Sequence, residues 1–575
     1  MSLAFLVDKA QSKVTVSDLK DAAASLGFIV PEGQDTEDYL QLLQSTEAIV
    51  NQIQEAEDYI HPLLCPTPTT SPREFWELKK EDNILNAWRH RCDLVATNPT
   101  SSLLQGKTIA IKDNISIGGL PTTVGTFTEL LCKDGQLPVS PIDASVVSRV
   151  LLAGATIKGS STCENFCLSP LGYGSATGPV HNPQLIGFTT GGSSSGSAAL
   201  VSANTLQEPE NKFGETVNIA IGGDQAGSIR IPASYCGVYG LKPTHGLVPY
   251  TGAIPLAPMI DHLGPMAGSL DDIASLLQVM AGYDGIDPRM TPESPLRHQV
   301  PNYSKILEGF KTRTLENGEL IGSGLKIGIL TESFEILGLS EQVRNTVLDS
   351  ARRFFGAAGA EVIDISVPMH RIGSLIWTAA TRMSASETAC QGKTGGFLSF
   401  LPPHVQARWP PDQEMYELLT GSNPSALNVM LSGPFLKEKF GPSVEAKAHR
   451  KVFELRATYD EAFTQVDILV TPCAPTVAMG HPKMQDDAEG PRSTVMEKVS
   501  LAVGVTTNTA PFNATGHPAM NVPCGFGQDP NQPEVDLPIG MQLIGRRWEE
   551  AMILKAATVF EEGRAISKAG SKHLD

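Results

Sequence analysis

The chain has 575 residues, of which 41% are hydrophobic and 18% are charged, and its formal net charge is −18. This composition is typical of a large globular enzyme and argues against a coiled coil or a disordered scaffold. The negative charge opposes binding to nucleic acid and to anionic lipid, and no run of basic residues offsets it. No apolar stretch is long enough to span a membrane. The nine scattered cysteines lack paired spacing and indicate reduced thiols in a cytoplasmic protein.

The first 85 residues have the pattern of an α-helical segment. Ser17 offers helix-capping chemistry before Leu19, and Gly27 offers a stop. Apolar residues then recur at helical intervals up to Ile60, separated by Glu and Gln. Two interpretations stay open: a helical cap on the core, or an arm through which the protein forms a homodimer.

Residues 86–575 are predicted to form one catalytic domain of the α/β class. Short β-rich runs, such as residues 108–111, 217–221 and 325–330, are separated by Gly and Pro and alternate with helical stretches at 144–152 and 270–280. This alternation predicts a central sheet covered by helices on both faces.

Three segments carry a pattern that suggests nucleophilic catalysis: residues 109–114, 191–199 and 222–233. The N–H groups of a Gly-rich turn can converge on one point and stabilise an oxyanion, and Ser228 ends such a turn. A serine hydroxyl needs a base. Lys112 ends an apolar run that would carry it into a dry interior, where a neutral lysine can serve as that base.

Residue chemistry alone leaves other interpretations open. A Ser/Gly-rich stretch is also typical of a flexible or phosphate-binding loop, and a lysine after a strand is commonly a surface residue. Residues 192–196 match G-x-S-x-G with Ser194 in the centre, and His262 and His517 follow in the order of an α/β-hydrolase. That alternative requires a strand directly before the turn, whereas residues 182–190 are predicted to be a loop.

Taken together, the three segments resemble the amidase signature family. Its members carry Lys in an Ile-Lys-Asp context, then Gly-Gly-Ser-Ser, then Gly-Ser-Ile-Arg-x-Pro, and the matching residues are Lys112, Ser193 and Ser228. Residues 246–253, 260–265 and 508–518 resemble the bacterial amidases that follow nitrile hydratases, which also have an extra N-terminal helical segment. The resemblance covers roughly residues 85–560.

This resemblance implies a mixed, mostly parallel sheet and a seryl acyl-enzyme, without cofactor or metal. Ser228 would be the nucleophile, Ser193 the proton relay behind a cis peptide bond from Gly192, and Lys112 the general base. Backbone N–H groups of residues 225–228 would form the oxyanion hole, and Asp224 and Arg230 would hold that loop. The residues expected to contact the substrate are Gln225, Ala226, Gly227 and Cys167.

Three departures from the family pattern concern substrate preference. Gln225-Ala226 stands where Thr-Gly is common, Ser195 replaces a common Gly, and residues 206–215 form a polar insertion. The expected reaction is hydrolysis of a small carboxamide to a carboxylic acid and ammonia or an amine, with esterase side activity. Two alternatives are a glutaminase-type subunit of a tRNA-dependent amidotransferase and a binding protein without catalysis.

Overall fold

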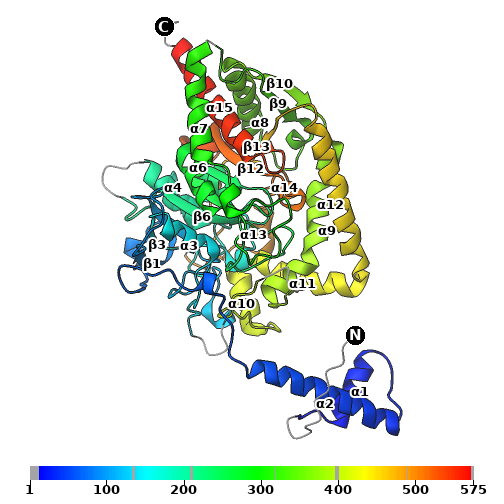
Figure 1. Ribbon diagram of the computed structural model, residues 1–575. Helices are drawn as coiled ribbons and strands as arrows, with labels where there is room; N and C mark the ends of the chain where they lie inside the picture. Colours follow the sequence, from blue (N-terminus) through cyan, green and yellow to red (C-terminus); the bar gives the residue numbers. More distant parts are fainter. Residues whose placement is uncertain are drawn as a thin grey trace. The chain divides into compact units, whose positions relative to one another are not determined.

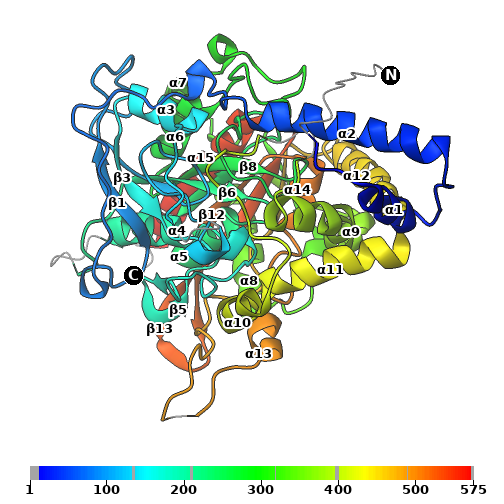
Figure 2. The same cartoon turned by 90° about the horizontal axis from the view of Figure 1, so that it is seen from below.

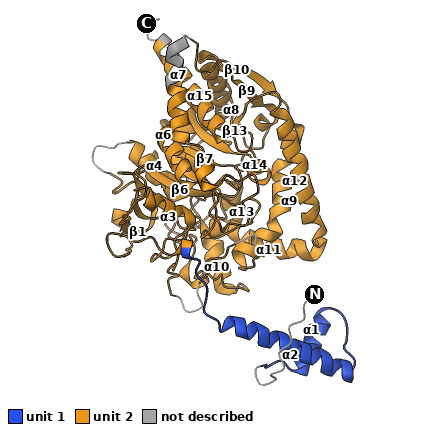
Figure 3. Cartoon of the chain, in the orientation of Figure 1, with its two compact units in different colours: residues 1–62 blue, residues 63–575 orange. Residues whose placement is uncertain are grey.

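A computed structural model describes the chain over residues 12–131, 136–206, 212–317, 319–394, 400–488 and 490–571. It contains two compact units, residues 1–62 and residues 63–575 (Figure 3). Residues 63–85, which the sequence pattern assigned to the N-terminal segment, belong to the second unit. Residues 207–211 of the predicted insertion lie outside the described residues.

The first unit is a pair of helices, α1 (Val16–Ser25) and α2 (Gln34–Gln54). Thr15 and Asp18 form a reciprocal cap at the start of α1, because each backbone N–H donates to the side chain of the other residue. Leu19, Ala23 and Val30 form a small core against Leu40 and Leu43. The remaining large apolar side chains of this unit are mostly exposed, among them Leu26, Phe28, Ile29 and Tyr39.

The second unit is built on a mixed sheet of eleven strands. From one edge to the other the strands are β1 (Trp88–Leu94), β3 (Thr156–Ser161), β2 (Thr108–Lys112), β6 (Ile219–Asp224), β8 (His262–Ala267), β7 (Tyr239–Lys242), β12 (Ala519–Asp529), β13 (Gln532–Gly545), β11 (Ile468–Pro472), β9 (Lys326–Leu330) and β10 (Glu361–Ile365). A separate short ladder joins β4 (His181–Asn182) and β5 (Leu185–Thr189).

The mixed α/β sheet agrees with the sequence prediction, but the expected predominance of parallel pairing needs correction. Parallel pairs occupy two regions: β2 pairs with β3 and β6, and β9 pairs with β11 and β10. The strands between them, β8, β7, β12 and β13, pair antiparallel with their neighbours, and so does β1 at the edge. The hairpin between β12 and β13 makes that one pair antiparallel, because two residues cannot connect parallel strands.

Helices cover both faces of the sheet because its central strands are apolar on both sides (Figures 1 and 2). In β2, Ile109 and Ile111 contribute to one core cluster, and Ala110 contributes to another on the opposite face. The helices on the first face include α3 (Ser145–Leu152), α6 (Leu270–Met280), α8 (Glu341–Ser350) and α15 (Glu550–Ser571). The opposite face is covered by α4 (Ser195–Leu206) and, farther along, by α9 (Gly373–Ala385), α12 (Ser443–Ala462) and α14 (Ala510–Thr515).

The remaining helices are α5 (Arg230–Cys236), α7 (Tyr303–Asn317), α10 (Gln413–Ser422), α11 (Pro424–Phe440) and α13 (Val495–Ser500). Within the described part of the chain, no helix combines the length and hydropathy needed to cross a bilayer.

Candidate active site

Lys112 is the last residue of β2, and its side chain is completely buried. Its Nζ donates one hydrogen bond to Ser193 Oγ at 2.9 Å and another to the carbonyl oxygen of Gly223 at 3.1 Å. Strand β2 pairs in parallel with β6, so the ends of both strands meet at the same edge. The pairing therefore brings two of the three predicted segments together.

The third segment joins them through Ser193 and its neighbour. The peptide bond between Gly192 and Ser193 is cis, in agreement with the resemblance. Ser193 is fully buried, and the backbone N–H of Ser194 donates to the carbonyl oxygen of Ser228 at 3.1 Å. One backbone hydrogen bond thus holds the Ser193 segment against the turn that carries Ser228.

The turn at residues 225–228 is shaped by the carboxylate of Asp224. Its two oxygens accept the N–H groups of Gly227 at 2.7 Å and of Ile229 at 3.1 Å. The Gly227 N–H is therefore not available to an oxyanion, contrary to the expectation that all four amides of the turn converge. The amides of Gln225, Ala226 and Ser228 form no hydrogen bond with the described residues.

A buried ion pair holds Asp224 in place. Arg230, the first residue of α5, donates from Nε and Nη2 to the two Asp224 oxygens at 3.0 and 2.9 Å. Burial alone would raise the pKa of Asp224, but the attraction of Arg230 outweighs it and holds that pKa well below its ordinary value. The carboxylate stays charged and keeps the turn closed, the role that the resemblance implies for this pair.

Three more side chains fix the turn from distant parts of the sequence. Thr509 Oγ1 donates to the carbonyl oxygen of Ala226 at 2.5 Å, and Trp377 Nε1 donates to that of Gln225 at 2.9 Å. The side chain of Gln225 donates to Tyr250 Oη at 2.9 Å. None of the three was assigned a role from the sequence; Thr509 and Tyr250 lie in stretches that resemble the family, whereas no motif marked Trp377.

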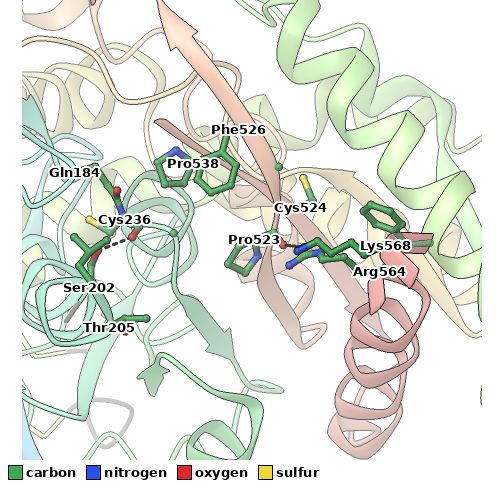
Figure 4. Close-up of a pocket in the computed structure, with 14 residues that line it drawn as sticks. Gln184, Ser202, Thr205, Cys236, Pro523, Cys524, Phe526, Pro538, Arg564 and Lys568 are labelled. Carbon is green, nitrogen blue, oxygen red and sulfur yellow. Dashed lines mark hydrogen bonds between the residues drawn. The ribbon is translucent and has the colours of Figure 1, made fainter. Parts of the chain in front are cut away.

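Ser228 and Cys167 open into a cavity of about 210 Å³. Its apolar lining residues include Leu168, Pro170, Leu256, Trp377, Val429 and Ala502, and its polar lining residues besides Ser228 are Ser169, Gln225, Arg382, Ser425, Asn428 and Thr506. A larger cavity of about 410 Å³ lies between β12, β13 and α15 (Figure 4), but Lys112, Ser193 and Ser228 are absent from its lining. The smaller cavity is therefore the candidate substrate site.

Comparison with known proteins agrees with this geometry. A family model described as Amidase matches residues 85–554, which is most of the chain. The chain belongs to the Amidase family. It is an enzyme that hydrolyses amide C–N bonds.

Relatives of this amidase include two functional groups. An enantioselective amidase from Rhodococcus rhodochrous is 32% identical over 491 residues, covering 84% of this chain and 83% of the relative. A glutamyl-tRNA(Gln) amidotransferase subunit from Synechococcus sp. (strain CC9311) is 33% identical over 466 residues, covering 80% and 84%.

Solved structures share the same fold. The corresponding glutamyl-tRNA(Gln) amidotransferase subunit from Thermotoga maritima superposes with a TM-score of 0.61 at 25% identity, covering 84% of this chain and 88% of that chain. The peptide amidase from Stenotrophomonas maltophilia gives a TM-score of 0.57 at 24% identity, covering 80% and 82%.

The alternative centred on Ser194 lacks the contacts that an α/β-hydrolase needs. Among the described residues, Ser194 Oγ is bonded only to the backbone of Gly223, as donor at 3.1 Å and acceptor at 3.2 Å. His262 bonds the carbonyl oxygen of Ile260, and His517 bonds Asp460, so neither imidazole reaches Ser194. The predicted loop before this turn was wrong, because β5 ends at Thr189, but β5 pairs with β4 outside the large sheet.

Cys167 is a cavity residue with unusual chemistry. Phe166 and Cys167 both adopt left-handed backbone angles, with φ of 53° and 57°, which turns the chain sharply below the site. The hydrogen bond from the Cys163 thiol lowers the pKa of Cys167, burial opposes this shift, and the interaction with Lys112 adds to it. The thiolate of Cys167 is thus stabilised beside Ser228.

Iodoacetamide should therefore modify Cys167 at a rate that rises with pH and reaches half of its maximum below the pH of about 8.5 that is usual for a free thiol, because the thiolate is the reactive form. Modification should block amide hydrolysis, since the adduct fills the cavity. The control is Cys236, whose pKa burial raises and which should stay unmodified in the folded amidase. Peptide mass mapping after timed quenching measures both. A Cys167 rate that only begins to rise above about pH 8 would contradict the assignment.

Glu164 is a buried acid that no sequence motif indicated. It accepts hydrogen bonds from Ser195 Oγ at 3.0 Å and from the backbone N–H of Gly174. Burial raises the pKa of Glu164 to about 8, so the protonated form is favoured at neutral pH. Ser195, which departs from the family pattern, thus gains a partner that glycine could not have.

In the described part of the chain, no group of three His, Cys, Asp or Glu side chains is arranged to hold a metal ion.

Proposed function

We propose that Ser228 attacks the carbonyl carbon of a small carboxamide and forms an acyl-enzyme, with Ser193 relaying protons to Lys112. The observation that carries this proposal is the 2.9 Å hydrogen bond from Lys112 Nζ to Ser193 Oγ, in a segment bonded directly to Ser228. The side chains that we assign to the substrate are those of Gln225 and Cys167. We also assign it Ala226 and Gly227 as residues of the turn, with Gly227 shaping the turn through its N–H bond to Asp224 rather than binding the oxyanion.

In the first half of the reaction the proton of Ser228 Oγ passes to Ser193, while the proton of Ser193 passes to Lys112. The oxyanion that forms accepts hydrogen bonds from the free amides of the turn, at Ala226 and Ser228. The proton then returns to the departing nitrogen as the C–N bond breaks. Water attacks the Ser228 ester through the same relay and releases the acid, and an ester substrate follows the same route.

A fluorophosphonate tests the assignment of the nucleophile. It should form a covalent adduct on Ser228, which peptide mass mapping identifies, and the adduct should abolish hydrolysis of a panel of short aliphatic and aromatic amides. An adduct on Ser194 would favour the α/β-hydrolase alternative instead.

A second candidate function is that of a glutaminase component that supplies ammonia to a charged tRNA. The match to the glutamyl-tRNA(Gln) amidotransferase subunit from Synechococcus sp. supports it. The two functions differ in whether activity requires partner proteins. An independent amidase hydrolyses amides alone, whereas glutaminase activity that arises only with added partner proteins would identify the second function.

The first unit supports a proposed homodimer. Leu26, Phe28, Ile29, Tyr39 and Leu42 border an apolar groove of about 420 Å³ on this unit. Apolar surface of this kind is commonly buried in an interface. We expect the full chain to have twice the mass of one chain at micromolar concentration, and the double variant Leu26→Ser/Ile29→Ser to lower it. Sedimentation measures the mass; a monomer for the unaltered chain would contradict the proposal.

We also propose a cytoplasmic location. All the cysteines of the described residues are free thiols, and most are buried, as is usual in a reducing compartment.

A further inference from the structure

Arg382 is a cation placed in the wall of the cavity that Ser228 enters. It lies on α9, and Trp377 of the same helix donates its indole N–H to the carbonyl oxygen of Gln225. This bond fixes α9 against the catalytic turn. Helix α11, which packs on α9 (Figure 2), supplies Ser425 and Asn428 to the same cavity. Arg382 and Ser228 thus line the same cavity, and α9 is bonded to the turn that carries Ser228.

The guanidinium of Arg382 forms no hydrogen bond and no ion pair with any described residue. Other buried or half-buried arginines of this chain are engaged. Arg230 pairs with Asp224, Arg289 pairs with Asp287, and Arg149 donates to the carbonyl oxygens of Met280 and Ala281. Burial lowers the pKa of Arg382, and no nearby carboxylate counters this effect.

A half-buried cation without a partner is costly, and proteins normally supply one. The described residues that line the cavity include no Asp or Glu. Leu256, Val429 and Ala502 supply apolar surface to the wall, and its other polar members are neutral. Arg382 is partly exposed, and its nitrogens are not among the buried polar atoms that lack a partner. A molecule bound in the cavity can therefore supply an anionic acceptor that no described lining residue supplies. A carboxylate matches a guanidinium best, because two parallel N–H···O bonds form at once.

We propose that Arg382 is the specificity-determining residue of this amidase and binds a carboxylate at the far end of the substrate. The substrate class is then the monoamides of small dicarboxylic acids, with a short apolar chain between the carboxylate and the scissile amide. This inference rests on the proposed function, because it takes Ser228 as the reacting group.

Paired substrates of nearly equal shape test the proposal. Succinamate and butyramide differ chiefly in the terminal carboxylate, and glutaramate and valeramide form a longer pair. The unaltered enzyme should hydrolyse the anionic member of at least one pair with a kcat/KM about tenfold higher or more, the range expected for a charged hydrogen bond. Equal rates, or preference for the neutral member of both pairs, would overturn the proposal.

Substitutions then assign the preference to Arg382. Arg382→Ala should remove this preference mainly by raising KM for the anionic amide, so that kcat/KM for succinamate falls to about the value for butyramide. Arg382→Glu should favour 4-aminobutanamide, which carries a cation at the same end. The matched control, Arg353→Glu, makes the same charge change at an exposed residue outside the cavity lining and should leave the preference intact. If Arg382→Ala lowered kcat/KM equally for both substrates of a pair, Arg382 would have a structural role and the proposal would be contradicted.

The two proposals fail in different ways. If a fluorophosphonate labels Ser228 and neutral amides are hydrolysed, but anionic amides are not preferred, only the role of Arg382 is wrong. If neither kind of amide is hydrolysed and Ser228 is not labelled, the proposed function itself is wrong. The preference of the unaltered enzyme decides the matter even where a variant does not fold.

Discussion

Replacing Ser228 by alanine should lower kcat for amide hydrolysis by roughly four to six orders of magnitude, the range found when a serine nucleophile is removed. The side chain is small and only 6% exposed, so its loss leaves the turn held by Asp224 and Thr509 intact. Steady-state kinetics with a chromogenic amide measures the loss. Labelling by a fluorophosphonate should disappear in the same variant.

Ser194→Ala is the matched control for Ser228→Ala. Both residues are buried serines of the site, but Ser194 Oγ is engaged with the backbone of Gly223. Losing those bonds should lower the melting temperature by a few degrees, in line with about 1 kcal/mol for a hydrogen bond, and leave labelling at Ser228. A Ser194 variant that is inactive while the Ser228 variant keeps activity would reverse the assignment of the nucleophile.

Replacing Lys112 by alanine should lower amide hydrolysis by roughly two to four orders of magnitude, the usual contribution of general acid–base catalysis. Ester hydrolysis should fall less. An amine needs a proton to leave, whereas a phenoxide leaves without one, and Lys112 is the residue that returns the proton through Ser193. Comparing kcat/KM for an anilide and the matching phenyl ester measures the difference.

Lys112→Arg is the companion variant. It places a permanent positive charge beside Ser193 Oγ, and a guanidinium does not release its proton, so activity should not return. If Lys112→Arg restored amide hydrolysis, the side chain would act by charge alone. If Lys112→Ala lost amide and ester hydrolysis to the same extent, its role as the acid for the leaving group would be wrong.

The sequence predicted the parts of the site that depend on local chemistry. Lys112, Ser193 and Ser228 stand in motifs whose order and residue types are specific, and the structure brings the three segments together. The α/β class followed from alternating apolar runs. The antiparallel centre of the sheet could not be predicted, because strand direction depends on which distant strands pair. A short run such as residues 239–242 carries little information about the strands beside it.

The sequence does not predict the contacts between segments that are distant along the chain. Nothing in the sequence indicates that Gly227 donates its amide N–H to Asp224, since that follows from the geometry of one turn. Trp377 and Arg382 belong to an ordinary amphipathic helix, and only its packing places them beside Ser228. The low pKa of Cys167 likewise arises from neighbours that the fold supplies.

The catalytic turn depends on residues nearly three hundred positions downstream, and this has a consequence for how the enzyme matures. Asn513 donates to Asp224, and Thr509 donates to the carbonyl oxygen of Ala226. Contacts of such long range form slowly, because a large loop must close before they stabilise anything. A nascent chain emerging from the ribosome therefore carries its reactive serine without the supports that shape the oxyanion site. The enzyme becomes active only after residues 509–513 have been synthesised and packed against the catalytic turn. We therefore expect chains that end before residue 509 not to hydrolyse amides.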